Sequence, residues 1–455
     1  MRVPFSTPQS VAIVPAADSP VSSRVRDVLN HRSDVAIVGS GPYALSLASQ
    51  LRARGVDFRI FGPPMKFWHD MPRTINLKSF AFATNIYVPA KGNTLPDWCR
   101  SHGKRHHEPC PMSTFAAYGM AMQSRFVPSL EPVQVVRVSI ADGGFELTLE
   151  SEERLFARRV VFATGLTGFS NVPGVLRSLP SDLLSHTFDL GDREYDRLRG
   201  KDVIVVGGGA SAIEAGALVH EVGGRAQILV REAEAIFHET IGEGHRSLYE
   251  RLRWPASAIG FGLKSRVLEM VPMGLHFVPE GPRVRFIKKH LGPAAPGWIK
   301  DRVVGKVPIL VRTQVLAAER SGDRVRLRLR SEGEADRTVE ADHVIAGTGY
   351  VADVDRLTYL DAGLRRQVRR VERAPKLSIN FESTVKNAYF LGPVAAMSFG
   401  PLFRFVAGAD YAAPALARHL AGPMRAVSSV LRRFGRPGEA PAEDEAAAPS
   451  ASRTV

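Results

Sequence analysis

The chain has 455 residues, of which 44% are hydrophobic and 23% charged, and 60 Lys and Arg against 46 Asp and Glu give a net charge of +14. These fractions are those of a globular protein and exclude collagen, a coiled coil and wholesale disorder. At roughly 150 residues per domain, the length predicts two or three domain-sized units. Cys99 and Cys110 form no C-x-x-C motif, which excludes a dithiol centre, a thiolate zinc site and a disulfide framework. We therefore expect no metal site and a cytoplasmic location.

Neither end of the chain is expected to fold, and the excess of basic residues does not predict a nucleic-acid or membrane partner. Residues 1–33 lack sustained periodicity and predict a flexible arm, and the Pro, Ala and acid-rich residues 422–455 predict a disordered tail. No segment combines a basic cluster with interleaved aromatic residues, so we expect no nucleic-acid binding. No uninterrupted apolar stretch of about 18 residues occurs, so we expect no membrane span.

Residues 34–61 have the order strand, glycine turn, helix, strand, which opens a dinucleotide-binding βαβ unit. Gly39 allows a sharp turn, Gly41 allows the backbone to approach a pyrophosphate, and the small Ala44 allows the helix to pack on the sheet. The free N–H groups of the helix N-terminus supply the anion site. The second strand ends in Gly62 rather than in the acid that usually binds a ribose hydroxyl.

The same pattern recurs over residues 201–230, with Gly207, Gly209 and Ala212 in the corresponding positions. Its second strand ends in Arg231 followed by an acid. Arginine at this position suits a 2′-phosphate, so the motif favours NADPH and leaves NADH open. Two such motifs predict two dinucleotide sites in one chain.

Further segments give a family resemblance. The strand 158–165 ends in Ala-Thr-Gly, the strand 342–350 is its counterpart, and His186 precedes the second glycine motif. In these segments the chain resembles the flavin-containing monooxygenases. The resemblance implies FAD at the first site and NAD(P)H at the second. It also implies an α/β fold in which an NAD(P)H domain (200–335) is inserted in a discontinuous FAD domain (34–190 and 340–421), both Rossmann-like.

The loop 67–79 resembles the loop that lies over the isoalloxazine ring in lysine and ornithine N-hydroxylases, and 387–404 resembles the final FAD strand, loop and helix of the superfamily. Positive charge from Lys78 or Arg404 would lie near the flavin or an anionic substrate; the alternative for each is a solvated or carboxylate-paired side chain. His186 would line the domain junction or cap a turn. These three are the candidate catalytic residues. The resemblance implies that FAD contacts Gly39, Gly41, Ala44, Trp68, Met71, Ser79, Gly165 and Gly392, and NAD(P)H contacts Gly207, Gly209, Ala212 and Arg231.

The resemblance implies a monooxygenase that uses NAD(P)H and O₂ to hydroxylate a small molecule through a flavin C4a-hydroperoxide. Similarity of W-H-x-M-P and S-F-G-P-L-x-R to bacterial FAD-dependent urate hydroxylases makes conversion of urate to 5-hydroxyisourate the first substrate hypothesis. The alternatives are N-hydroxylation of an amine or amino acid, and a non-oxygenating reductase or non-catalytic FAD-binding protein. The sequence leaves open whether the protein forms a homo-oligomer.

Overall fold

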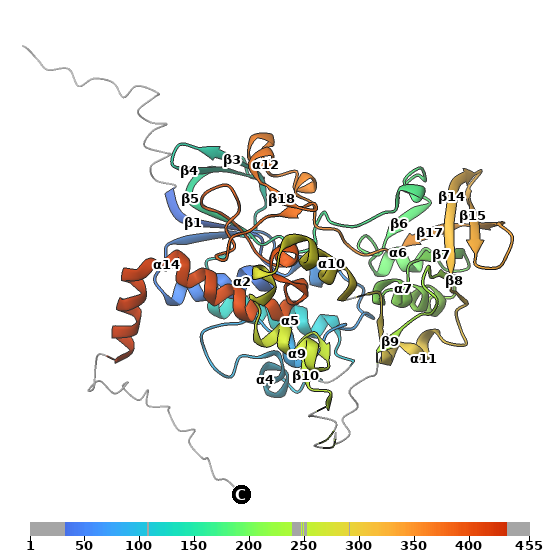
Figure 1. Cartoon of the computed structure of the whole chain (residues 1–455), viewed down its shortest axis with the longest axis horizontal. Coiled ribbons are helices and arrows are strands. Elements are labelled where there is room, and N and C mark those ends of the chain that lie inside the picture. The colour runs from blue at the N-terminus through green and yellow to red at the C-terminus, as the bar shows by residue number, and fades with distance from the viewer. Residues whose placement is uncertain are drawn as a thin grey trace, which may run out of the picture.

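The computed structural model describes residues 32–106, 109–238, 247, 249, 253–290 and 292–434, with side chains as far as residue 422. The described elements form two α/β bodies that lie side by side and are joined by crossing segments (Figure 1). The predicted N-terminal arm therefore lies almost wholly outside the described residues.

The first body is built on a sheet of β1 (Arg32–Val38), β2 (Phe58–Phe61), β3 (Val135–Ala141), β4 (Gly144–Leu149), β5 (Arg154–Phe162) and β20 (Ala388–Phe390). The strand order is β2-β1-β5-β4-β3, and β20 also pairs with β5. The strands β1, β2, β5 and β20 are parallel, whereas β3 and β4 form an antiparallel extension. The run Val35–Val38 is buried, as expected for a parallel strand covered on both faces.

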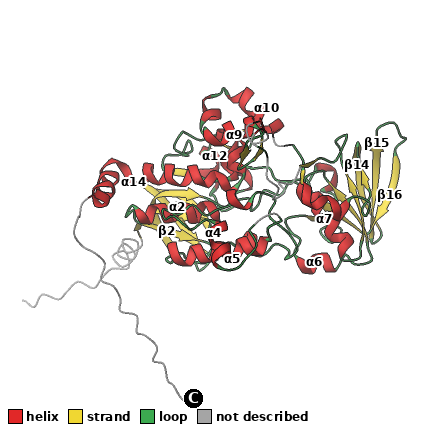
Figure 2. Cartoon of the chain, turned by 90° about the horizontal axis from the view of Figure 1, so that it is seen from below, coloured by secondary structure: helices red, strands yellow, loops and turns green. Residues whose placement is uncertain are grey.

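The second body is built on a parallel sheet of β6 (Leu184–His186), β7 (Asp202–Val206), β8 (Arg225–Leu229), β13 (Ile309–Leu310) and β17 (His343–Ala346). Its order is β13-β8-β7-β17-β6. A three-stranded antiparallel sheet of β14 (Thr313–Ser321), β15 (Arg324–Ser331) and β16 (Arg337–Ala341) lies at its outer end (Figure 2). The alternation of buried Val325, Leu327 and Leu329 with exposed arginines in β15 is that of a sheet with one covered face.

Two short strands lie in a different sheet from the one that the sequence suggested. The sequence placed β6 within the FAD segment 34–190 and β17 within the FAD segment 340–421, but both pair in the second sheet, where β17 lies between β7 and β6. Short apolar runs carry no signal for which of two sheets they join, because either sheet would bury them equally. The remaining domain boundaries stay a prediction.

Part of the sequence predicted as the NAD(P)H domain packs on the first body. It lies between β9 (Phe237–His238) and β12 (Ala295–Pro296), and includes β10 (Ala256–Ser257), β11 (Gly260–Phe261), α9 (Leu263–Met270) and α10 (Glu280–His290). Arg283 Nε donates a hydrogen bond to the Met397 carbonyl at 3.1 Å, and His276 Nδ1 lies 3.3 Å from the Ser398 carbonyl. The segment between β9 and β12 therefore contacts the loops that follow β20 in the first body.

The remaining helices are α2 (Pro42–Ala53), α3 (Lys66–His69), α4 (Leu95–Ser101), α5 (Met112–Phe126), α6 (Asp192–Asp196), α7 (Ala210–Glu221), α11 (Lys300–Val303), α12 (Ala362–Gln367), α13 (Ala396–Phe399) and α14 (Ala409–Phe434). The helix α14 has a break at Gly422, where φ is 68°. Residues 422–434 therefore continue as helix where the sequence predicted a disordered tail, and residues 435–455 lie outside the described residues. None of the described helices has both the length and the apolarity to cross a membrane.

Gly347 packs closely against Ala212 in the second body, which leaves no room for a larger residue at position 347. A Cβ added to Gly347 would lie 2.5 Å from the Ala212 Cβ. We expect Gly347→Ala to destabilise the protein by about 2 kcal/mol, because overpacked sites must shift backbone. Gly174→Ala is the matched control, since a Cβ there meets nothing within 4 Å. Thermal unfolding of the two variants checks this, and equal melting temperatures would contradict it.

Candidate functional site

A cavity of about 590 Å³ lies where the loops that follow β1, β5 and β20 meet α7 of the second body. Its wall brings together residues from sequence segments more than 350 positions apart. Nine residues predicted for the FAD site or the catalytic group line it: Gly39, Gly41, Trp68, Met71, Lys78, Ser79, Gly165, Gly392 and Arg404. The resemblance therefore selected residues that the fold gathers at one place.

The first glycine turn has the geometry that a pyrophosphate requires. Gly39 has φ 115°, and a Cβ there would lie 2.4 Å from the Ala163 carbonyl oxygen. A Cβ on Gly41 would instead meet nothing within 4 Å, so this position opens onto the cavity. Gly41 precedes α2, whose first turn has no acidic residue and no side-chain cap. The free N–H groups of α2 thus remain available to an anion.

The glycine at position 62 is explained by the turn itself. Gly62 has φ 130°, and a Cβ there would lie 2.9 Å from the Ser40 Oγ. Ser40 Oγ in turn donates a hydrogen bond to the Pro63 carbonyl at 2.7 Å. No acid could occupy position 62 without moving this turn. Gln134, which the sequence reasoning missed, is a polar residue on the cavity wall.

Tyr43 ties the Arg404 segment to the first glycine turn. Its hydroxyl lies 2.8 Å from the Phe405 carbonyl and 3.1 Å from the Phe403 carbonyl. Burial raises the pKa of Tyr43 well above its ordinary value, so the hydroxyl keeps its proton and donates. Ala44, the next residue, is fully buried in α2 and packs the helix rather than lining the cavity.

The aromatic residues of the loop 65–79 form one wall of the cavity. Trp68 packs edge-on against Phe115 of α5 with ring centroids 5.0 Å apart, and edge-on against Phe67 at 5.1 Å. Phe67 stacks on Phe188, which follows β6. The side chains of Trp68 and Met71 therefore present an apolar surface to the cavity, which suits exclusion of water.

A buried ion pair joins the two bodies at the cavity. Lys78 Nζ lies 2.7 Å from Glu214 Oε2, and the Glu214 side chain on α7 is only 1% exposed. Arg302 Nη1 lies 3.7 Å from the other Glu214 oxygen. Lys78 is therefore engaged with a carboxylate in this structure. The sequence reasoning missed Glu214, although an acid within the apolar run of α7 is a visible signal.

Arg404 is a cation on the cavity wall that has no carboxylate partner among the described residues. It lines the cavity and forms no ion pair with any residue that the structure describes. Arg404 is exposed in the open cavity, and desolvation by the nearby cavity wall lowers the pKa of its guanidinium from the ordinary value. An anionic group of a ligand would compensate this charge.

His186 is built into the crossing between the two bodies. Its Nδ1 accepts a hydrogen bond from the Phe188 N–H at 3.0 Å, which leaves Nε2 to donate to the Gly349 carbonyl at 3.0 Å. Its neighbours Thr187 and Phe188 line the cavity, but His186 is not among the lining residues. No ring nitrogen of His186 is therefore free for catalysis in this structure, which assigns it a structural role.

The burial of His186 leads to an expected pH dependence. Burial is the main cause that lowers the pKa of His186, so the unfolded chain binds a proton below about pH 6.5 that the folded chain resists. Its contribution to stability is therefore lost as pH falls below about 6.5. We expect the melting temperature of His186→Gln to fall less between pH 7 and pH 5 than that of wild type. His220→Gln, at an exposed position of α7, should keep the wild-type slope; equal slopes in all three proteins would refute the assignment.

The second glycine turn repeats the geometry of the first. Gly207 has φ 139°, and a Cβ there would lie 2.3 Å from the Gly347 carbonyl oxygen. Gly209 precedes α7, which has no side-chain cap and no acid in its first turn, and Ala212 is buried beneath it. Arg231 is 73% exposed and pairs with Glu232 at 3.1 Å. These residues stay the predicted NAD(P)H site.

The cysteines take no part in the cavity. Cys99 and Cys110 are free and buried, and neither lines the cavity. Burial raises the pKa of Cys110 to about 12, so its thiol is protonated at neutral pH. A reactive thiolate is therefore absent from the described wall of this site.

Comparisons with known proteins agree with this architecture. A model of the pyridine nucleotide-disulphide oxidoreductase family matches residues 33–253, as expected for an oxidoreductase that uses a pyridine nucleotide. No curated protein matches the sequence significantly.

Three solved structures illustrate the likeness in fold. The ornithine hydroxylase of Pseudomonas aeruginosa is 16% identical, with 86% of this chain and 99% of that chain covered and a TM-score of 0.66. The ornithine N-hydroxylase of Kutzneria sp. 744, described with reduced FAD, NADP⁺ and ornithine, is 16% identical, with 89% and 100% covered and a TM-score of 0.64. The bacillithiol disulfide reductase of Staphylococcus aureus is 16% identical, with 89% and 99% covered and a TM-score of 0.56.

None of these three structures is described as acting on urate, so the urate hypothesis gains no support from them. The predicted α/β class with two dinucleotide-binding domains is confirmed, and the likeness in fold to two ornithine hydroxylases agrees with the superfamily that the motifs suggested. The chain shares its two-domain α/β fold with these flavin- and pyridine-nucleotide-dependent enzymes, and residues 33–253 match the pyridine nucleotide-disulphide oxidoreductase family.

Proposed function

We propose that the protein is an FAD-dependent, NAD(P)H-using monooxygenase that N-hydroxylates a small amine. The observation that carries the proposal is the cavity at which the first glycine turn, the aromatic loop and α7 meet without a cysteine. Bound there, a flavin would supply hydride acceptance from NAD(P)H and activation of O₂. The chain itself supplies the pyrophosphate site at α2, the dry wall at Trp68 and the contact with the nucleotide domain through α7.

The charges at the cavity favour an amine that also bears a carboxylate. Arg404 is a cation without a carboxylate partner among the described residues, and it would orient such a carboxylate. Lys78 is already neutralised by Glu214 at 2.7 Å, so it attracts an anion less strongly. The likeness in fold to two ornithine hydroxylases points to the same substrate class.

The cysteine placement disfavours a disulfide reductase, despite the likeness in fold to one. Transfer of electrons from a flavin to a disulfide requires a reactive sulfur close to the ring. Cys99 and Cys110 are both buried away from the cavity wall.

The test uses purified FAD-loaded protein with NADPH or NADH and a panel of ornithine, lysine, cadaverine and urate. We expect one amine to stimulate NAD(P)H oxidation and to yield a hydroxylamine in step with the NAD(P)H consumed. Arg404→Met should raise the KM for an amino acid more than the KM for cadaverine, which lacks a carboxylate. Urate consumption without equimolar peroxide would instead support the hypothesis that urate is the substrate. Formation of peroxide alone with every compound would refute the proposal that the protein is a monooxygenase.

Arg231 should set the preference between the two nicotinamide cofactors. Its exposed guanidinium follows β8, where a 2′-phosphate would lie. We expect Arg231→Gln to raise the KM for NADPH by about tenfold, as for the loss of one charged hydrogen bond, and to leave the KM for NADH within about twofold. Steady-state oxidation with each cofactor checks this; an equal rise for both would count against a 2′-phosphate contact.

A further inference from the structure

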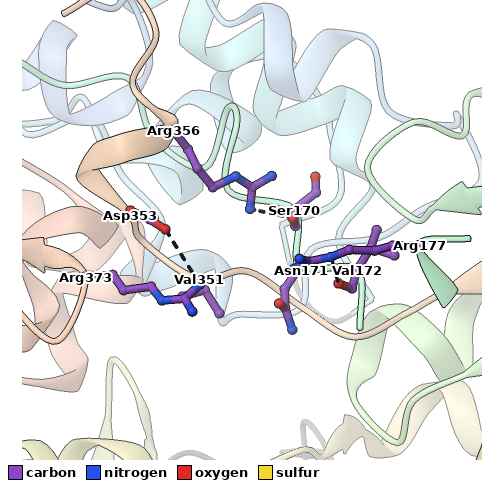
Figure 3. Close-up of a pocket in the computed structure, with 8 residues that line it drawn as sticks. All are labelled: Ser170, Asn171, Val172, Arg177, Val351, Asp353, Arg356 and Arg373. Atoms are coloured by element: carbon purple, nitrogen blue, oxygen red, sulfur yellow. Dashed lines mark hydrogen bonds and ion pairs between the residues drawn. The ribbon is translucent and has the colours of Figure 1, made fainter. Parts of the chain in front are cut away.

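A second pocket, of about 330 Å³, lies at the crossing between the two bodies (Figure 3). Arg177, Arg356 and Arg373 line it from three directions, together with Asp353. Two further lining residues, Ser170 and Val351, belong to the two segments that cross from one body to the other. Neither glycine motif contributes to it.

This pocket is separate from the flavin cavity, the cavity of about 590 Å³ described above, because the two share no lining residue. The two crossing segments are bonded to each other, since the Val351 N–H donates to the Phe169 carbonyl at 2.9 Å and the Asn171 N–H to the Gly349 carbonyl at 2.9 Å. Tyr350 lines the flavin cavity, whereas the next residue, Val351, lines the second pocket. A ligand in one pocket therefore does not occupy the other.

The charge of the pocket is unbalanced. Three guanidinium groups face one carboxylate, and Asp353 already accepts a hydrogen bond from the Asp355 N–H at 2.9 Å. Arg373 Nη1 lies 3.7 Å from Asp353, which is a loose ion pair. The three arginines therefore carry two more charges than the aspartate of this pocket can balance.

Backbone carbonyls hold two of these guanidinium groups in place. Arg356 Nη1 donates to the Ser170 carbonyl at 2.7 Å, and Arg177 Nε donates to the Val172 carbonyl at 3.1 Å. A neutral carbonyl orients a guanidinium without neutralising it. Each group keeps further N–H donors for a ligand, because arginine has five.

The arginines belong to different bodies. Arg177 follows η2 (Gly174–Leu176), whose Leu176 is in the core of the second body with Leu327 and Leu329. Arg356 ends η5 (Val354–Arg356), and the segment after η5 bonds to β3 of the first body, since the Val138 N–H donates to the Tyr359 carbonyl at 2.7 Å. A ligand held by both would span the junction.

We propose that this pocket is a further anion site, separate from both glycine turns, which binds a small phosphate-bearing molecule and thereby links the two bodies. Guanidinium groups bind phosphate oxygens through paired, charge-assisted hydrogen bonds, so three converging arginines match one or two phosphate groups. The volume is at the lower end of that of small-molecule sites. The site is independent of the substrate proposed above.

The test is calorimetric titration of full-length, FAD-loaded protein saturated with NADP⁺, so that both cofactor sites are filled. The probes are inorganic pyrophosphate and 5′-AMP at fixed ionic strength, and the one that binds more tightly distinguishes an inorganic from an organic source of the phosphate. We expect Arg373→Gln to raise the dissociation constant at least tenfold, corresponding to about 1.4 kcal/mol. Arg373 holds no backbone carbonyl in the described structure, so this variant should keep the wild-type melting temperature.

Arg154→Gln is the matched control. Arg154 is 72% exposed and lies 3.9 Å from Glu146, close to the 65% exposure and 3.7 Å of Arg373, but it does not line the pocket. The dissociation constant of the Arg154→Gln variant for the same probe should stay within twofold of the wild-type value. Failure of both probes to bind wild type, or an equal loss in both variants, would overturn the proposal. Because no turnover is measured, these outcomes do not depend on the proposed reaction.

Discussion

Gly41→Leu is expected to yield a folded protein that does not retain FAD. A Cβ at Gly41 meets no atom within 4 Å, so the larger side chain would not disturb the packing of the fold. It would instead extend into the cavity at the N-terminus of α2, where the pyrophosphate must approach the backbone. Purification without flavin, with a normal circular dichroism spectrum, is the expected result.

The matched control is Gly281→Leu on α10. A Cβ at Gly281 also meets nothing within 4 Å, and this residue does not line the cavity. It should retain FAD at the wild-type ratio of flavin to protein. Gly41→Leu with full flavin content would show that the first glycine turn is not the FAD site, whatever the substrate is.

Glu214→Gln is expected to damage both stability and turnover. The carboxylate is 1% exposed and pairs with Lys78 at 2.7 Å and Arg302 at 3.7 Å. Removing one partner of a buried pair leaves uncompensated charge, which destabilises the protein by about 3 kcal/mol. The pair also fixes the loop of Lys78 against α7, so we expect turnover to fall about 100-fold when that loop shifts. Chemical denaturation and substrate-stimulated NAD(P)H oxidation measure the two effects.

Glu221→Gln on the same helix separates burial from pairing. Glu221 Oε1 pairs with Arg302 at 2.7 Å, but its side chain is 39% exposed. Exposed pairs contribute about 0.5 kcal/mol, so this variant should have nearly the wild-type free energy of unfolding.

A double-mutant cycle tests the pair itself: Lys78→Met should lower the free energy of unfolding less in the Glu214→Gln background than in wild type. Equal effects of the Glu214 and Glu221 variants would mean that the buried pair does not join the bodies as we infer.

The sequence predicted the parts of the site that depend on local backbone geometry. Gly39 and Gly207 stand at turns with φ above 110°, where a Cβ would overlap a carbonyl oxygen of a neighbouring loop. Such requirements act on single positions, so they leave a mark in the sequence. The resemblance added the aromatic loop and Arg404, which the fold brings to the same cavity.

The sequence did not reveal which distant segments meet. β6 and β17 join the second sheet, α10 packs on the first body, and Glu214 faces Lys78 across the junction. Each depends on the packing of one body against the other. The sequence likewise left open whether His186 lines the junction or caps a turn, and the structure bonds both of its ring nitrogens within the crossing.

By itself, the sequence determined two dinucleotide-binding units, their order and the glycine positions at each turn, because these follow from steric rules within about 30 residues. Only the tertiary structure decided which charges at the junction are paired and which are not. Lys78 is neutralised by a carboxylate from the other body, whereas three arginines of the second pocket face a single aspartate. The balance of charge at a site depends on distances in space between residues far apart in the chain, and these distances are set when the two bodies pack together.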